Sequence, residues 1–292
     1  MRGKLFILIL RLLALLPLRL AHALGFVGGW LIYAIPNKSR DVAKINIEIC
    51  FPDKSAEERE RILKQSLIES AKTFTEIGGM WCWSPKRIAG LCQEVVGEEH
   101  LLKAKEQGNG MVMLTPHVGQ WEYLGLYYPS YMPLSAMYRP MRLENIEDFI
   151  TNARQRAGAS LEPANTKGVK AVFAALKRKE MVGILPDQNP VAGAGEYAPF
   201  FDRPAYTMVL VSKIAIKTGV PVLISYAERL PKGRGFRIVI HPVDEAIAEK
   251  PLEQSVTVLN RAIADCIREI PNQYQWIYKR FKFQPDGMKN PY

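Results

Sequence analysis

Short apolar runs alternate with helical patterns through most of this 292-residue chain, and this alternation restricts the fold more than any other feature. Runs of strand length occupy 111–115, 134–138, 181–185, 220–226 and 236–240. Helical patterns occupy 121–127, 143–157, 168–179, 208–218 and 252–270. Strands that alternate with helices usually form a largely parallel sheet covered by helices. We therefore predict an α/β fold, with a mixed or parallel sheet flanked by helices.

A long helix is predicted ahead of this alternating region, over residues 55–79. Ser55 and Glu58 have the spacing of a capping box, in which each side chain satisfies the other residue's backbone N–H. Gly78 and Gly79 are expected to end the helix, because glycine commonly follows the last helical turn.

The N-terminal segment, residues 5–35, is strongly apolar but carries basic residues on one helical face, among them Arg11, Arg19 and His22. Pro17 is expected to kink or split this helix. The pattern is typical of a helix lying in a membrane interface, although a spanning helix and an internal amphipathic helix are alternatives. We expect residues 1–36 to be a membrane anchor helix and residues 37–292 a cytoplasmic α/β domain.

Charge and cysteine spacing restrict the function classes further. Lys and Arg outnumber Asp and Glu by 39 to 29, which favours an anionic partner such as a phospholipid or a phosphorylated substrate. The four cysteines have no paired spacing, and the four histidines are scattered. This distribution is typical of free thiols in a reducing compartment, so we expect no metal site.

The sequence His117-Val118-Gly119-Gln120-Trp121-Glu122 directly follows the first strand-like run and Pro116. Histidine is the side chain most easily poised to take a proton near neutral pH. A nearby carboxylate can hold one ring nitrogen and leave the other for a substrate hydroxyl. We therefore interpret His117 as a candidate general base and Glu122 as its candidate orienting carboxylate.

Two further polar residues, Arg139 and Asp187, each follow a strand-like run. Sites in parallel sheets lie beyond the carboxyl ends of the strands, so we expect these residues near His117. Arg139 suits a phosphate or a developing oxyanion, with a structural ion pair as the alternative. Phe200 and Phe201 suit an acyl-chain channel, with plain core packing as the alternative. The tail at 274–282 interleaves basic and aromatic residues, which suits a membrane interface or nucleic acid.

The order and spacing of these blocks resemble the late acyltransferases of lipid A biosynthesis, the lauroyl and myristoyl transferase family. The resemblance covers nearly the whole chain. It rests on six blocks in order: the hydrophobic N-terminus, 116–122, 138–140, 186–188, 199–201 with Ala205 and Thr207, and the tail from Gln275 to Gly287. Small departures are Gln120 for the usual Asn, Asp202 for Gly, Tyr278 for His, and Gln284 for Arg.

The resemblance implies a fold similar to glycerol-phosphate acyltransferases and a bacterial inner-membrane enzyme facing the cytoplasm. Its activity would be transfer of an acyl chain from acyl carrier protein to a hydroxyl of a phosphorylated glycolipid, without a cofactor. His117 would be the base and Glu122 its partner. The expected substrate-binding residues are Arg139, Asp187 and Gln188, and the expected acyl-channel residues are Trp121, Phe200 and Phe201.

Three rival functions remain at this stage. Another lysophospholipid or glycolipid is an alternative acceptor, and hydrolysis of the thioester is a more distant alternative. A nucleic-acid-binding protein is disfavoured, because the sequence has neither a helix-turn-helix nor a zinc-finger pattern and begins with an apolar segment. Acyl-chain length depends on where the channel closes, which is a property of the folded chain.

Overall fold

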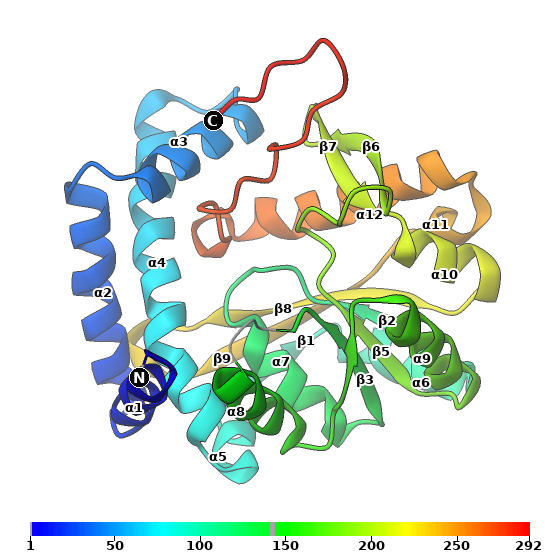
Figure 1. Ribbon diagram of the computed structural model, residues 1–292, viewed down its shortest axis with the longest axis horizontal. Coiled ribbons are helices and arrows are strands. Elements are labelled where there is room, and N and C mark those ends of the chain that lie inside the picture. The colour runs from blue at the N-terminus through cyan, green and yellow to red at the C-terminus, as the bar shows by residue number, and fades with distance from the viewer. Residues whose placement is uncertain (1, 141–143) are drawn as a thin grey trace.

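A seven-stranded sheet forms the centre of the molecule in the computed structural model, which describes residues 2–140 and 144–292 (Figure 1). The strands lie in the order β1-β9-β8-β2-β5-β3-β4. Their bounds are β1 Cys92–Val96, β2 Met111–Leu114, β3 Leu134–Tyr138, β4 Ser160–Pro163, β5 Met181–Ile184, β8 Val222–Arg229 and β9 Phe236–Pro242. Among these strands all neighbours are parallel except β8 and β9. The predicted mixed, mostly parallel α/β sheet is therefore confirmed.

Helices cover both faces of the sheet, because its central strands are apolar on both sides. In β2, Val112 and Leu114 pack into one core, whereas Met111 and Met113 pack into the other. The first core includes residues of α3, α4, α9, α10 and α12, and the second includes residues of α5, α6, α7 and α8. The bounds are α3 Lys38–Cys50, α4 Ala56–Cys82, α5 Pro85–Ala89, α6 Glu98–Glu106, α7 Trp121–Tyr127, α8 Glu144–Gln155, α9 Thr166–Lys177, α10 Leu210–Thr218, α11 Ala246–Glu249 and α12 Leu252–Glu269.

The five predicted strand runs are all confirmed, with ends that differ by at most three residues. The edge strands β1 and β4 were not predicted, because both are partly exposed and neither is a continuous apolar run. The antiparallel hairpin of β6 (Gly195–Phe200) and β7 (Arg203–Met208) was also missed. The five predicted helices are confirmed as well, although the predicted start of one at residue 143 lies outside the described residues.

The long helix α4 has the predicted capping box, in which Ser55 accepts from the Glu58 N–H and Glu58 accepts from the Ser55 N–H. Its predicted end at Gly78 and Gly79 is wrong, because the helix continues to Cys82. These glycines permit close packing instead. A Cβ on Gly78 would lie 2.5 Å from the carbonyl oxygen of Leu10 in the N-terminal helix.

The N-terminal segment forms two helices, α1 (Arg2–Ala14) and α2 (Leu18–Ala34), and the predicted break at Pro17 is confirmed. Both helices pack against α4, and α2 runs alongside it (Figure 1). Gly25 and Gly29 make this approach possible, because a Cβ at either position would lie within 2.6 Å of the α4 backbone. The inner face of α2 is therefore part of the packed interior.

The outer surface of the same two helices is apolar and exposed to solvent. Its exposed residues on α1 are Leu5, Phe6, Leu8, Ile9 and Leu12, and on α2 they are Leu20, Leu24, Phe26, Val27, Trp30, Leu31 and Ile32. In the described part of the chain, no single helix has the length and apolarity of a membrane span. The pair α2 and α3, bent by 82°, meets those criteria jointly.

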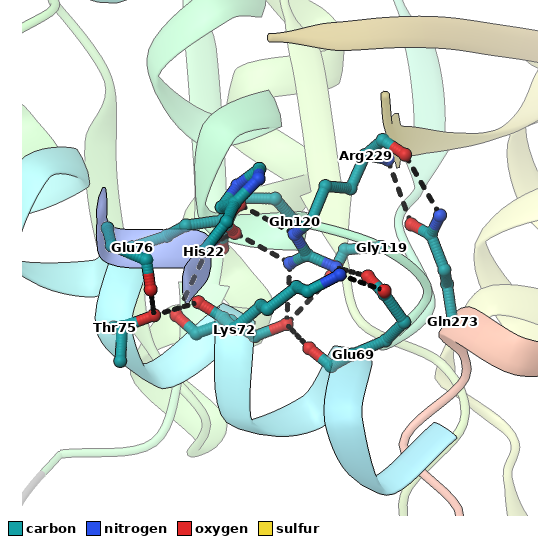
Figure 2. A network of polar contacts seen from close by, with 11 residues as sticks. His22, Glu69, Lys72, Thr75, Glu76, Gly119, Gln120, Arg229 and Gln273 are labelled. Carbon is teal, nitrogen blue, oxygen red and sulfur yellow. Dashed lines mark hydrogen bonds and ion pairs between the residues drawn. The ribbon is translucent and has the colours of Figure 1, made fainter. Parts of the chain in front are cut away.

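A buried ion network ties α2, α4, the sheet and the loop after β2 together (Figure 2). Arg229, at the end of β8, donates from Nε and Nη2 to the two carboxylate oxygens of Glu76 at 2.6 Å each. It also donates from Nη1 to Glu69 at 2.8 Å. His22 of α2 lies 2.5 Å from Glu76, and the Gln120 amide donates to Glu76 at 2.7 Å. One carboxylate thus joins four segments that are distant in sequence.

Each carboxylate in this network has a cationic partner, because Glu76 pairs with Arg229 and Glu69 pairs with both Arg229 and Lys72. Burial alone would raise the pKa of the Glu76 carboxyl, but the charge and hydrogen bonds of Arg229 outweigh burial and lower it to about 2. The same pair holds the pKa of Arg229 above its usual value. Glu76 and Arg229 therefore remain ionised at neutral pH, in a position where an unpaired charge would be very unfavourable.

We expect Arg229→Met to lower the free energy of unfolding by about 3–5 kcal/mol, because it leaves Glu76 buried without its ion partner. Arg237→Met is the matched control. Arg237 is 38% exposed at its side chain and pairs with Glu228 at the surface, so its loss should change stability by less than about 1 kcal/mol. Denaturant unfolding of the purified proteins measures both. Equal effects of the two substitutions would contradict this account of the network.

Candidate active site

His117 lies in the loop that connects β2 to α7, and the surrounding structure holds that loop on both sides. The Gly119 N–H donates to the carbonyl of Gln273, and the Gln120 N–H donates to the carbonyl of Ala227, each at 2.9 Å. Gly119 has φ +61°, and a Cβ there would lie 2.0 Å from the Ala227 oxygen. Only glycine fits this position, so the loop cannot shift without losing its bonds to β8 and the C-terminal segment.

Asp187 holds the imidazole of His117. The ring Nδ1 lies 2.8 Å from Asp187 Oδ1, and the backbone N–H of His117 donates to Oδ2 at 3.0 Å. Strand register explains the contact, because β2 and β5 are parallel neighbours in which Leu114 lies beside Ile184. His117 and Asp187 each follow three residues after these strand ends, and they lie side by side.

The environment of Asp187 keeps it ionised, since its side chain is almost completely buried. Burial alone would raise its pKa, but the charge and hydrogen bonds of His117 lower the pKa below its usual value. An ionised Asp187 can only accept, so the ring carries its proton on Nδ1. When the ring is neutral, its Nε2 is then a lone-pair acceptor.

Gln188 marks the position from which a substrate would approach that acceptor. Its side-chain amide nitrogen lies 3.2 Å from His117 Nε2 and donates to it in this tautomer. Trp121 packs near the same ring, with ring centroids 4.8 Å apart. Of the predicted residues, the structure thus brings Asp187, Gln188 and Trp121 to His117.

Glu122 differs from the sequence prediction that it orients the imidazole. Its side chain accepts from Trp81 Nε1 at 3.0 Å and from Arg154, which binds both carboxylate oxygens. Glu122 is the second residue of α7, and these partners lie on α4 and α8. Burial would raise its pKa, but Arg154 outweighs burial and lowers it. Asp187 takes the role at the ring that was expected of Glu122.

A cavity of about 800 Å³ opens beside His117 between one face of the sheet and α7. Arg139 and Gln188 follow the carboxyl ends of β3 and β5, and they line the cavity together with Lys213 of α10. Arg139 and Lys213 are exposed, and we call the end of the cavity beside them its mouth. Arg154 lines the wall beside Glu122, and most of the remaining lining is apolar. The cavity therefore combines exposed cations with an apolar lining, which suits an amphipathic substrate.

The predicted channel residues Phe200 and Phe201 do not line this cavity. Both are buried in the core beneath the C-terminal segment, with their ring centroids 5.2 Å apart and Phe51 packed against Phe201. They begin a tight turn between β6 and β7, in which Phe201 has φ +52°. The alternative of plain core packing is therefore correct for this pair.

The C-terminal tail has a structural role that its basic and aromatic composition did not indicate. Trp276, Arg280 and Phe281 are buried. Arg280 donates to Asn189 Oδ1 at 3.1 Å, and the Asn189 N–H donates to the Tyr278 hydroxyl at 2.9 Å. The tail thus braces the loop that carries Asp187 and Gln188. The suggestion that these buried residues form a membrane or nucleic-acid surface is wrong.

Sequence reasoning missed two residues of the site, Trp81 and Arg154. Trp81 lies near the end of α4 and Arg154 near the end of α8, and neither shows a distinctive local spacing, so only the three-dimensional packing reveals their contacts with Glu122.

Comparison with known proteins covers nearly the whole chain. The family described as bacterial lipid A biosynthesis acyltransferase matches residues 3–283. The chain is 27% identical over 285 residues to a lipid A biosynthesis lauroyltransferase of Escherichia coli (strain K12), covering 97% of this chain and 92% of that protein. It is 29% identical over 259 residues to a palmitoleoyltransferase of the same strain, covering 87% and 82%. A lipid A biosynthesis acyltransferase of Haemophilus influenzae is 29% identical over 284 residues, covering 96% and 87%.

We expect Asp187→Asn to change the tautomer of His117, because an amide can donate to Nδ1 whereas a carboxylate only accepts. The neutral ring of the unaltered protein should carry its proton on Nδ1, and that of the variant should shift toward Nε2. Imidazole nitrogen NMR of histidine-labelled protein distinguishes the two forms. Glu122→Gln is the control and should leave the tautomer unchanged. A shift in Glu122→Gln but not in Asp187→Asn would reverse the assignment.

Proposed function

Since the chain belongs to the bacterial lipid A biosynthesis acyltransferase family, we propose that it moves a fatty acyl chain from acyl carrier protein to a hydroxyl of a lipid A precursor, with His117 as the general base. Membership shows an acyltransferase of lipid A biosynthesis. The thioester donor, the acceptor hydroxyl and the base are parts of the proposal. The observation that carries it is the Asp187–His117 pair at the mouth of an apolar cavity.

The chemistry requires a base, because an alcohol is a poor nucleophile until its proton is removed. In the proposed step the acceptor hydroxyl displaces the Gln188 amide at His117 Nε2 and gives its proton to the ring. Its oxygen attacks the thioester carbonyl, the new C–O bond forms, and the C–S bond breaks. The imidazolium returns the proton to the departing thiolate. Asp187 stabilises the imidazolium in between, as the acid of a catalytic triad does.

Direct transfer is favoured over a covalent acyl-enzyme. Neither serine nor cysteine lines the cavity in the part of the chain that the structure describes. Cys50 and Cys266 are buried in the core, and burial raises the pKa of both thiols, which makes them weak nucleophiles. The base therefore acts on the acceptor alcohol itself.

The cations around the cavity suit two anionic partners. Arg139 and Lys213 lie at its mouth, where a phosphorylated sugar would enter and where an acidic carrier protein would deliver its acyl group. Glu122 and Arg154 form a pair in the wall, and this pair fixes the guanidinium where α8 meets α7. Arg139 remains the candidate for contact with a substrate phosphate or the developing oxyanion.

The exposed apolar surface of α1 and α2 supports a membrane location, which we propose to be the bacterial inner membrane, with the active site facing the cytoplasm. Soluble proteins rarely expose so continuous an apolar surface. Helices whose inner face packs on the protein and whose outer face is apolar are suited to lie in the interface plane. A lipid acceptor would then meet the cavity without leaving the bilayer surface.

We expect His117→Ala to lower acyl transfer by about 10²–10⁴-fold, the usual contribution of a general base. The assay combines acyl carrier protein charged with a fatty acid and a lipid A precursor that lacks the secondary chain, with products identified by mass spectrometry. His100→Ala is the matched control, because His100 lies on α6, away from the cavity, and pairs with Glu99. Near-normal turnover by His117→Ala would refute the mechanism. Release of free fatty acid without lipid acylation would refute the acceptor.

We expect the double variant Leu12→Glu, Leu15→Glu to bind vesicles of phosphatidylethanolamine and phosphatidylglycerol about tenfold more weakly or worse, because two apolar contacts with lipid are replaced by charges. Both leucines are more than half exposed, so the fold should persist. Leu102→Glu on α6, 43% exposed, is the control and should bind normally. Cosedimentation measures the bound fraction. Unchanged binding of the double variant would contradict the proposed membrane face.

A further inference from the structure

One wall of the cavity is the sheet, and strand register determines which of its lining residues lie side by side. Met113, Gly183 and Ala136 lie side by side in β2, β5 and β3. Leu134 is two residues before Ala136 and begins β3, whereas Tyr138 ends it, so Leu134 and Tyr138 are separated by roughly 13 Å along the strand. All of these residues line the cavity.

The opposite wall is α7, which begins beside His117 and leads away from it. Trp121, next to His117, is followed on the same helical face by Gly125 and Tyr128, and all three line the cavity. At the usual helical rise, Gly125 lies roughly 6 Å and Tyr128 roughly 10 Å below Trp121. Gly183 and Ala136 line the cavity on the sheet side, so both walls carry small residues.

Gly125 has no packing reason to be glycine. A Cβ built there has no atom within 4 Å, whereas a Cβ on Gly25 or Gly29 of α2 would collide with the α4 backbone. Glycine inside a helix lowers stability by roughly 1 kcal/mol relative to alanine. Backbone geometry does not require it either, because Gly125 is helical. What glycine provides at this position is empty space in the cavity.

Large side chains lie at the end of both walls that is furthest from His117. Leu134 begins β3 and Tyr128 directly follows α7; both are buried, and the Tyr128 hydroxyl donates to Ser225 Oγ at 2.5 Å. That hydrogen bond ties the Tyr128 ring to β8, and we call Leu134 and Tyr128 the floor of the cavity. The cavity thus has His117 at one end, a passage lined by Gly125, Gly183 and Ala136, and this floor at the other end.

We propose that Gly125 admits the donor's acyl chain into the lower cavity, and that the Leu134–Tyr128 floor sets the chain length. This inference rests on the proposed function. The thioester carbonyl must lie at His117, so the chain attached to that carbonyl continues down the passage beside it. Relatives of the chain are named for lauroyl and for palmitoleoyl transfer, so family membership leaves the length open.

The test measures kcat/KM for a series of acyl carrier protein donors whose straight chains differ by two carbons. Gly125→Leu fills the passage, so its optimum should move to a shorter chain. Each methylene of the acyl chain that no longer fits in the cavity should lower kcat/KM about fourfold, and two methylenes about 15-fold. Gly125→Ala should give a smaller shift in the same direction. Leu134→Ala lowers the floor and should move the optimum to a longer chain.

Gly28→Leu is the matched control, because Gly28 is also a helical glycine with open space around its Cβ but lies on α2. Its chain-length profile should equal that of the unaltered protein. A uniform loss of activity in Gly125→Leu across all chain lengths would overturn the proposal, as would a change in acceptor preference alone.

Failure of the proposed function is recognised separately, as no transfer of any chain by the unaltered protein. In that case calorimetric titration with free fatty acids of the same lengths provides the readout. A shift of the tightest-binding length toward shorter chains in Gly125→Leu would still support the passage. Identical length profiles in the two proteins would overturn it.

Discussion

The ion pair between Arg229 and Glu76 is the interaction on which the rest of the structure depends. It lies where the end of β8, the long helix α4, the N-terminal helix α2 and the loop after β2 meet. In that loop, Val118 next to His117 pairs with Tyr274 of the C-terminal segment. Two residues later, the side chain of Gln120 donates to the Glu76 carboxylate. The loop that carries His117 is thus held by the Arg229–Glu76 pair, although neither residue lines the cavity.

The active site illustrates how two carboxylates with similar burial take different roles. Asp187 accepts from the imidazole, which leaves the ring's other nitrogen free to take a proton. Glu122 accepts from Arg154 and Trp81, which ties α7 to α4 and α8. Both carboxyls remain ionised, because each one has a cationic or hydrogen-bonding partner that outweighs burial. Partner geometry, rather than distance along the chain, decides which carboxylate contacts His117.

Sequence patterns identified His117, Arg139 and Asp187 as polar residues at the ends of buried strands, and the fold brings them to one edge of the sheet. They did not reveal that β2 and β5 are neighbours, because strand order depends on how the crossover helices pack. Without that order, the nearest carboxylate in sequence, Glu122, was the natural choice of partner for His117. Arg154 and the hairpin β6–β7 were missed for a related reason, since neither has a local pattern that differs from ordinary helix or loop.

The insertion of His22 into the buried network has a practical consequence for handling the protein. Removing α1 and α2 to obtain a soluble fragment would remove a partner of Glu76 and uncover the α4 backbone at Gly25 and Gly29. The helices with the exposed apolar face and the loop that carries His117 are therefore linked through one buried carboxylate. A treatment that separates α2 from α4 would disturb that loop as well, so purification has to keep these helices packed together.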